Sequence, residues 1–317
     1  MRKIFRLTTL LLVMVLLLTA CGGGNSTPTV PTAPTAPTGG ADVEFTSDGG
    51  IDRSDWPEVI RFAVTGLEGL EELQRNYEPF RQLLMEMLGV DFEFFALSSR
   101  VVSATAMQFG QVDVILSGSS EYVQIKYETP DVEILAAIQR PYHHTAFIVR
   151  AESPMQTLDD LRGATIGMGS IGSTSRHIGP SAMLIEEGFD LDNDFTIHNL
   201  GTSGSMEALR NGDVDAIAAG IRDFWDLENE FGAGVFRVLV EGPQLPPDSF
   251  VASPNLPESF RAELSRVLLT YSDVLLDAML ASEGEDSNKY AGAVIIMAYD
   301  YYFDAIREAY RVLGLEL

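Results

Sequence analysis

The stretch Gly167-Met168-Gly169-Ser170-Ile171-Gly172-Ser173-Thr174-Ser175 decides the fold, because signals for a strand, a turn and a helix meet in it. The apolar run Ala164-Thr165-Ile166 before it predicts a strand, and Ala182-Met183-Leu184-Ile185 after it predicts a helix that ends near Gly188. The glycines are typical of a tight turn between the two. Three hydroxyl side chains stand at the expected start of the helix.

The hydroxyl side chains of Ser173, Thr174 and Ser175 allow two interpretations. The first N–H groups of a helix have no internal partner and the helix dipole is positive there, so this end attracts an anion, to which the hydroxyls would donate. Serine and threonine are also common N-caps that bind only their own backbone. The local sequence leaves both interpretations open.

The glycines offer a competing interpretation, because Gly167, Gly169 and Gly172 match the dinucleotide pattern G-x-G-x-x-G. That pattern is expected in the first strand–helix–strand unit of a chain, whereas here it lies in the middle. The next expected strand, residues 195–200, does not end in the carboxylate that would hold a ribose. The sequence therefore favours an anion site over a dinucleotide site, and we expect no cofactor.

The composition restricts the partners. The chain has 317 residues, enough for two domains of ordinary size, and a formal net charge of −25. Because nucleic acid binding needs basic patches, no nucleic acid partner is expected. In a chain with this negative charge, an anion site must be a local region of positive potential, built from backbone N–H groups and a few cationic side chains.

The N-terminus has the pattern of a processing signal. Arg2, Lys3 and Arg6 precede the apolar core Leu10–Leu18, which is too short for a comfortable membrane span. Cys21, the only cysteine of the chain, follows at once, as in bacterial lipoprotein signals. We therefore expect residues 1–20 to be a signal peptide, Cys21 to be the lipidated residue, and the protein to be extracytoplasmic and membrane-anchored.

Residues 21–55 are expected to form a tether. The segment 27–38 consists almost entirely of threonine, proline and alanine, a composition that cannot build a packed core. Proline-rich chains extend by about 3.1 Å per residue, so the tether would hold a folded domain away from the membrane. Folded structure is expected from Trp56 onward.

From residue 59 the pattern alternates between strands and helices, which predicts mostly parallel sheets covered by helices on both faces. The expected strands are 59–64, 91–97, 112–116, 132–138, 146–149, 164–166, 195–200, 214–219 and 236–240. The longer expected helices are 70–88, 101–109, 257–280 and 293–313. Ligands of such sheets lie beyond the carboxyl ends of the strands. In the last helix, Tyr299, Tyr301, Tyr302 and Phe303 are expected to be core residues.

Several short motifs resemble one known family. They are Phe80 with 88–90, Gly110–Asp113, Leu158–Gly163, Gly172–Ser175, Asn211–Asp215 and Leu245–Asp248. Residues from about 60 to 253 resemble the substrate-binding proteins of phosphonate, phosphite and phosphate ABC importers, a branch of the type 2 periplasmic binding proteins. The Ser-Thr-Ser sequence at the helix start is the most specific of these motifs.

The resemblance implies a two-lobed α/β fold with the ligand held in a cleft, each lobe a mostly parallel sheet flanked by helices. Lobe 1 would comprise residues 56–148 plus 250–317, and lobe 2 residues 149–249. Hinges are expected near 147–149 and 248–251. The partners implied are a small oxyanion and an ABC permease, and a monomer is expected.

The resemblance also implies ligand-binding residues. Ser173, Thr174 and Ser175 would hold the oxyanion, and Asp248 would accept a hydrogen bond from the ligand. Ser117 and Gly118 would form the wall of the first lobe, with Tyr122 a weaker candidate. The chain departs from the family at Arg100, where a tyrosine is common, at Thr202, where a histidine is common, and at Arg222, where aminophosphonate binders carry a carboxylate. If these arginines face the cleft, they favour additional negative charge on the ligand and disfavour an amine.

Other functions have weaker support. A hydrolase would need a nucleophile, a base and an orienting carboxylate, and His177 near Ser170 and Ser173 is not accompanied by the third group. The four histidines, His143, His144, His177 and His198, have no metal-ligand spacing. No enzyme activity and no metal are therefore expected. A sensory binding protein for another small organic anion remains an alternative that the sequence does not separate from transport.

Overall fold

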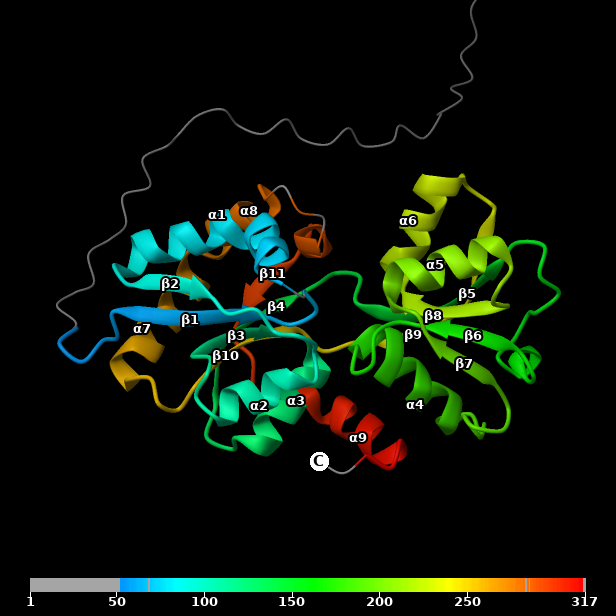
Figure 1. Ribbon diagram of the computed structural model, residues 1–317, viewed down its shortest axis with the longest axis horizontal. Coiled ribbons are helices and arrows are strands. Elements are labelled where there is room, and N and C mark those ends of the chain that lie inside the picture. Colours follow the sequence, from blue (N-terminus) through cyan, green and yellow to red (C-terminus); the bar gives the residue numbers. More distant parts are fainter. Residues whose placement is uncertain (1–51, 68, 283, 285, 316–317) are drawn as a thin grey trace, which may run out of the picture. The chain divides into compact units, whose positions relative to one another are not determined.

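The computed structural model of the protein describes residues 52–315, except 68, 283 and 285 (Figure 1). The expected signal peptide, Cys21 and residues 21–51 of the expected tether lie outside the described residues. Within the described part of the chain, no helix combines the length and the apolar character needed to cross a membrane.

The first lobe is built on a mixed sheet with the strand order β11-β4-β10-β3-β1-β2. Its strands are β1 (Val59–Val64), β2 (Asp91–Phe94), β3 (Val114–Ser117), β4 (Glu133–Gln139), β10 (Asp248–Ala252) and β11 (Val294–Ile296). Its helices are α1 (Leu70–Leu88), α2 (Val102–Gln108), α3 (Ser119–Glu128), α7 (Glu258–Thr270), α8 (Ser272–Leu280) and α9 (Asp304–Val312), with 3₁₀ turns η3 (Asp286–Tyr290) and η4 (Asp300–Phe303).

The second lobe is built on a sheet with the strand order β7-β6-β8-β5-β9. Its strands are β5 (His144–Arg150), β6 (Thr165–Met168), β7 (Thr196–Asn199), β8 (Ala216–Gly220) and β9 (Phe236–Gln244). Its helices are α4 (Gly179–Glu186), α5 (Gly201–Asn211) and α6 (Ile221–Phe231), with a 3₁₀ turn η1 (Asp159–Leu161) and a π-helical turn η2 (Thr174–Ile178).

The two-lobed α/β fold is confirmed, but the sheets are mixed rather than mostly parallel. In the first sheet β1 pairs in parallel with β2 and β3, whereas β10 runs antiparallel to both β3 and β4. In the second sheet β6 pairs in parallel with β7 and β8, whereas β5 runs antiparallel to β8 and β9. The strands β5 and β10 are antiparallel to their neighbours because the chain enters each of them directly from the other lobe. Parallel neighbours would need a helical connection within the same lobe.

Each sheet is covered on both faces, and alternate residues of its strands face opposite layers. In β5, Phe147 packs in a cluster with Leu184 of α4, whereas Ile148 packs in a cluster with Leu209 of α5 on the other face. Figure 1 shows α1 and α8 on one side of the first sheet and α2 and α3 on the other. Because both faces of these strands are covered by helices, consecutive residues are buried. This explains the long apolar runs in the sequence.

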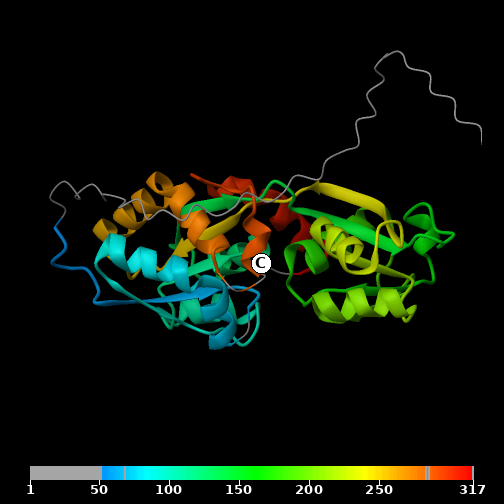
Figure 2. The ribbon, with the colours of Figure 1, turned by 90° about the horizontal axis from the view of Figure 1, so that it is seen from above.

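Two segments connect the lobes. The chain leaves the first sheet after Gln139, at the end of β4, and enters the second sheet at His144, the start of β5. It returns between Gln244 and Asp248, and the two segments are joined by a hydrogen bond from Leu245 N to His143 O (2.7 Å). Figure 2 shows both connections from above. We call residues 140–143 the first crossover and residues 245–247 the second crossover.

The crossovers bear on the expected lobe limits and hinges. The expected limits at 148/149 and 249/250 fall inside β5 and β10, which are paired within their sheets. The segments 147–149 and 248–251, where we expected the hinges, are held by the same pairing. A hinge must absorb changes in φ and ψ. The crossovers lie outside this strand pairing and are joined by one backbone hydrogen bond, so they are better placed to bend than these strands.

Two expectations about the C-terminal region are wrong. The expected single helix over 257–280 is interrupted at Tyr271, between α7 and α8. The expected helix over 293–313 instead contains β11, η4 and α9, because Val294–Ile296 pairs with β4 at the edge of the first sheet. Tertiary pairing thus overrides a helical pattern in a run of β-branched residues.

The aromatic residues of this region are only partly buried. Phe303 is fully buried and packs against Tyr122, with ring centroids 4.3 Å apart. Tyr299 and Tyr301 are 51% and 64% exposed and stack on each other. The core assignment is therefore right for Phe303 and wrong for these two tyrosines.

Candidate ligand-binding site

A cavity of about 900 Å³ is lined by residues from both lobes and from the first crossover. Nine of the ten ligand-binding residues expected from the sequence line it. They are Arg100, Ser117, Gly118, Ser173, Thr174, Ser175, Thr202, Arg222 and Asp248. The tenth, Tyr122, does not line the cavity: it is 1% exposed and its hydroxyl donates to Asp300 Oδ1 (2.6 Å).

The expected helix after the glycine-rich turn starts as the π-helical turn η2 and continues as α4. Such turns are frequent at functional sites. Ser173 stands at the N-cap position, but its side chain makes no capping hydrogen bond. The N-cap interpretation of this hydroxyl is therefore wrong.

The three hydroxyl residues have different surroundings although all are buried. Ser173 and Ser175 are 4% and 6% exposed, line the cavity and make no side-chain hydrogen bond with any described residue. Thr174 Oγ1 accepts from Ser120 N (3.0 Å) and lies 2.8 Å from Ser120 Oγ. Thr174 therefore helps to join the lobes, whereas Ser173 and Ser175 have hydroxyls free to bind a ligand.

Thr65, Ser117 and Gly118 form the wall of the first lobe. Gly118 N donates to Thr65 Oγ1 (3.0 Å), and the Ser117 hydroxyl donates to Ser249 O at 3.4 Å, near the limit of a hydrogen bond. These contacts fix the carboxyl ends of β1 and β3, where the sequence predicted the site.

Two arginines of the cavity are held by buried carboxylates. Arg100 Nη1 donates to Glu121 Oε1 (2.6 Å), and the Glu121 side chain is 1% exposed. Arg176 donates twice to Asp223, from Nε to Oδ2 (2.7 Å) and from Nη2 to Oδ1 (2.6 Å). Such charge-assisted bonds fix the guanidinium groups in one orientation.

Glycine lets both arginines lie against the backbone. A Cβ atom on Gly66, which has a φ of +90°, would lie 2.2 Å from Arg100 Nη2. A Cβ atom on Gly169 would lie 2.5 Å from the Arg176 Cβ. Gly169 of the glycine-rich turn thus makes room for an arginine side chain, which accounts for its place in the pattern without a dinucleotide.

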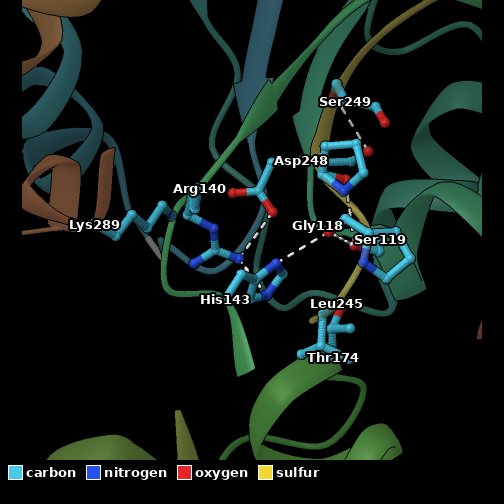
Figure 3. Close-up of polar contacts among 12 residues, drawn as sticks. Gly118, Ser119, Arg140, His143, Thr174, Leu245, Asp248, Ser249 and Lys289 are labelled. Carbon is cyan, nitrogen blue, oxygen red and sulfur yellow. Dashed lines mark hydrogen bonds and ion pairs between the residues drawn. The ribbon is translucent and has the colours of Figure 1, made fainter. Parts of the chain in front are cut away.

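A polar network joins the crossovers to β10 (Figure 3), and through Tyr290 also to η3. Arg140 Nη2 donates to Asp248 Oδ1 (3.1 Å) and to His143 Nε2. His143 Nδ1 lies 3.0 Å from Pro246 O, and the Tyr290 hydroxyl donates to Asp248 Oδ2 (3.1 Å). Both oxygens of Asp248 therefore have partners within the protein.

Arg222 differs from the other cationic side chains of the cavity. Arg100, Arg140, Arg176 and Lys289 each form an ion pair. The half-buried Arg222 has no hydrogen bond or ion pair with any described residue. It lies in the first turn of α6, where the helix dipole already attracts anions, so both features favour a negative group at this end of the cavity.

One histidine beside the glycine-rich turn is bonded to the backbone of that turn. His177 Nδ1 accepts from Gly172 N (3.3 Å). Among the residues that the structure describes, no group of histidine, cysteine, aspartate or glutamate is arranged to hold a metal ion.

Sequence reasoning missed several polar residues of the cavity, among them Arg140, His143, Arg176 and Lys289. Arg140 follows the carboxyl end of β4, so the rule that identified Ser117 could have identified it too. Arg176 directly follows the Ser-Thr-Ser sequence. Lys289 reaches the cavity from η3, more than a hundred residues later, and no local signal marks it.

These features define the class of protein. Two lobes built on mixed sheets, joined by two crossovers and lining one cavity, match the type 2 periplasmic binding proteins. Residues 62–289 match the family described as ABC transporter, phosphonate, periplasmic substrate-binding protein. This match covers more than half of the chain, so the protein belongs to that family.

Two curated relatives agree with this assignment. The phosphate-import protein PhnD of Mycolicibacterium smegmatis is 28% identical over 175 residues, 51% of this chain and 54% of the relative. The phosphonates-binding periplasmic protein of Escherichia coli is 24% identical over 225 residues, 68% of this chain and 66% of the relative. The aligned part thus spans less than two thirds of each relative.

Solved structures support the fold. PhnD1 from Prochlorococcus marinus, solved in complex with methylphosphonate, has a TM-score of 0.68 at 19% identity and covers 82% of this chain and all of its own. The aliphatic sulphonate binding protein SsuA from Escherichia coli has a TM-score of 0.59 at 16% identity and covers 81% of this chain and 87% of its own. At such identities the likeness concerns the fold alone.

Proposed function

We propose that this protein is an extracytoplasmic solute-binding protein of an ABC importer and that it captures a phosphonate-, phosphite- or phosphate-like oxyanion in the cavity between its lobes. One observation carries the proposal: Ser173 and Ser175 present unpartnered hydroxyls inside a cavity also lined by arginines, in a chain with a net charge of −25. A local cluster of donors and cations in an acidic protein is suited to an anion.

The proposal extends to the partners and the location. The ligand would be passed to an ABC permease, and the protein would act as a binding protein without catalysis, as a monomer. Cys21 would carry the lipid anchor, since it follows a basic and apolar leader. Labelling with a radioactive fatty acid tests the lipid anchor. We expect the wild type to be labelled and Cys21→Ala to remain unlabelled.

The ligand class is tested by isothermal titration calorimetry with methylphosphonate, phosphite and phosphate, with a sugar and an amino acid for comparison. We expect at least one of the three oxyanions to bind with micromolar or tighter affinity, which corresponds to roughly 8 kcal/mol or more. Failure of all three to bind, together with binding of the sugar or the amino acid, would contradict the proposal.

A further inference from the structure

Arg140 is held in the cavity through one of its three side-chain nitrogens. Nη2 makes both of its side-chain hydrogen bonds, to Asp248 and to His143. The Nε–H group is buried and has no partner among the described residues. The side chain is 14% exposed and lines the cavity, and its Nη1 group makes no hydrogen bond with any described residue, which leaves this group free to donate to a ligand (Figure 3).

Asp248 is engaged on both oxygens and its charge is compensated. Oδ1 accepts from Arg140 and Oδ2 from Tyr290, and the Asp248 side chain is 5% exposed. A carboxylate paired with a guanidinium at 3.1 Å is a weaker acceptor for a ligand O–H group than an unpaired one. These contacts make Asp248 a residue that positions Arg140.

His143 supports the same arrangement. Its Nδ1 lies 3.0 Å from the Pro246 carbonyl, which only accepts, so Nδ1 carries the hydrogen and Nε2 accepts from Arg140. This pattern requires the neutral ring. Burial, and then the positive charge of Arg140, lower the pKa of His143 well below its usual value, so the ring is neutral at neutral pH.

We infer that Arg140 is an oxyanion-binding residue, positioned by Asp248 and His143, and that the cavity takes the fully ionised form of its ligand. This inference rests on the proposed function. A fully ionised phosphonate gains charge-assisted hydrogen bonds from Arg140 and from the hydroxyls of Ser173 and Ser175. A singly protonated phosphonate at Arg140 would need an acceptor beside this side chain, and the carboxylate there, Asp248, already accepts from Arg140 and Tyr290.

Other titratable groups face this part of the cavity. On η3, Asp286 pairs with Lys289 (2.8 Å), and Tyr290 is neutral because burial, foremost, raises its pKa well above its usual value. From η2, Arg176 adds positive charge near His143. His144, on β5 beside the first crossover, also lines the cavity. The variant His144→Gln removes this titratable ring, so protons exchanged on ligand binding by the variant do not come from His144.

The test is calorimetry of methylphosphonate binding near the second pKa of the ligand, in two buffers with different ionisation enthalpies. The difference between the measured heats gives the protons exchanged on binding. Selection of the fully ionised ligand requires net proton release, in the wild type and in His144→Gln alike. Proton uptake, or no exchange, overturns the inference while leaving the proposed function intact. No binding of methylphosphonate, phosphite or phosphate overturns both.

Variants test the role of Arg140 directly. Arg140→Gln should weaken methylphosphonate binding by about tenfold to a hundredfold, as expected for a lost charge-assisted hydrogen bond. Arg75→Gln makes the same charge change at an exposed position of α1 that does not line the cavity, and this variant should bind like the wild type. A folded Arg140→Gln with wild-type affinity overturns the inference. If Arg140→Gln does not fold, the proton release measured with the wild type still tests whether the cavity takes the fully ionised ligand.

Discussion

Substitution of Asp223 by alanine should reduce the free energy of unfolding by about 3 kcal/mol. Asp223 is 4% exposed and accepts two hydrogen bonds from Arg176 and one from Gly220 N (2.8 Å). Removing one partner of a buried ion pair leaves an uncompensated charge, which costs about 3–5 kcal/mol. The lower end applies because the Arg176 side chain remains 26% exposed and is partly hydrated.

Urea denaturation measures this loss as a lower midpoint at an unchanged slope. Glu230→Ala is the matched control, because Glu230 is an exposed residue of the same helix, α6, and should change the stability by less than about 0.5 kcal/mol. If Asp223→Ala loses no more stability than the control, the Arg176–Asp223 pair does not stabilise the second lobe.

The second large effect concerns ligand selectivity and depends on Arg222. We expect the wild type to bind carboxylated phosphonates more tightly than aminoalkyl phosphonates, since Arg222 is an unpaired cation that lines the cavity. In Arg222→Glu the preference should shift toward the amine by roughly a hundredfold or more. One charge-assisted interaction, worth about 1.5–3 kcal/mol, is lost for the carboxylate and another is gained for the ammonium group.

Calorimetry with a matched pair of such phosphonates gives the affinity ratio for each variant. Asp226 and Glu230 also line the cavity from α6, so a glutamate at position 222 joins an acidic set suited to an amine. Arg75→Glu should leave the ratio at its wild-type value. A folded Arg222→Glu with an unchanged ratio would mean that Arg222 does not contact the ligand.

The sequence predicted much of this architecture because its signals are local. The strand expected before the glycine-rich turn is present as β6, and the helix expected after it is present as η2 followed by α4. The hydroxyls of Ser173 and Ser175 face the cavity because the carboxyl ends of parallel strands meet at one edge of a sheet. To apply that rule, only the position of each strand along the chain has to be known. These positions could be deduced from the alternation of apolar and polar segments.

What the sequence did not predict depends on contacts distant in the chain. Tyr122 was a candidate because it lies near Gly118, but its hydroxyl bonds to Asp300, which no local pattern indicates. Residues 294–296 have a helix-compatible pattern, and only pairing with β4 makes them a strand. The role of Asp248 depends on Arg140 and Tyr290, which are 108 and 42 residues away.

The proposed function places an oxyanion between the lobes, at Ser173 and Ser175. A crystal structure of the protein grown with methylphosphonate would show where the ligand binds. We expect phosphonate oxygens within hydrogen-bonding distance of the Ser173 and Ser175 hydroxyls, about 2.5–3.0 Å for such a bond, with a guanidinium of the cavity in contact. A phosphonate bound elsewhere, or a cavity that contains only water at saturating ligand, would show that these serines do not bind the oxyanion.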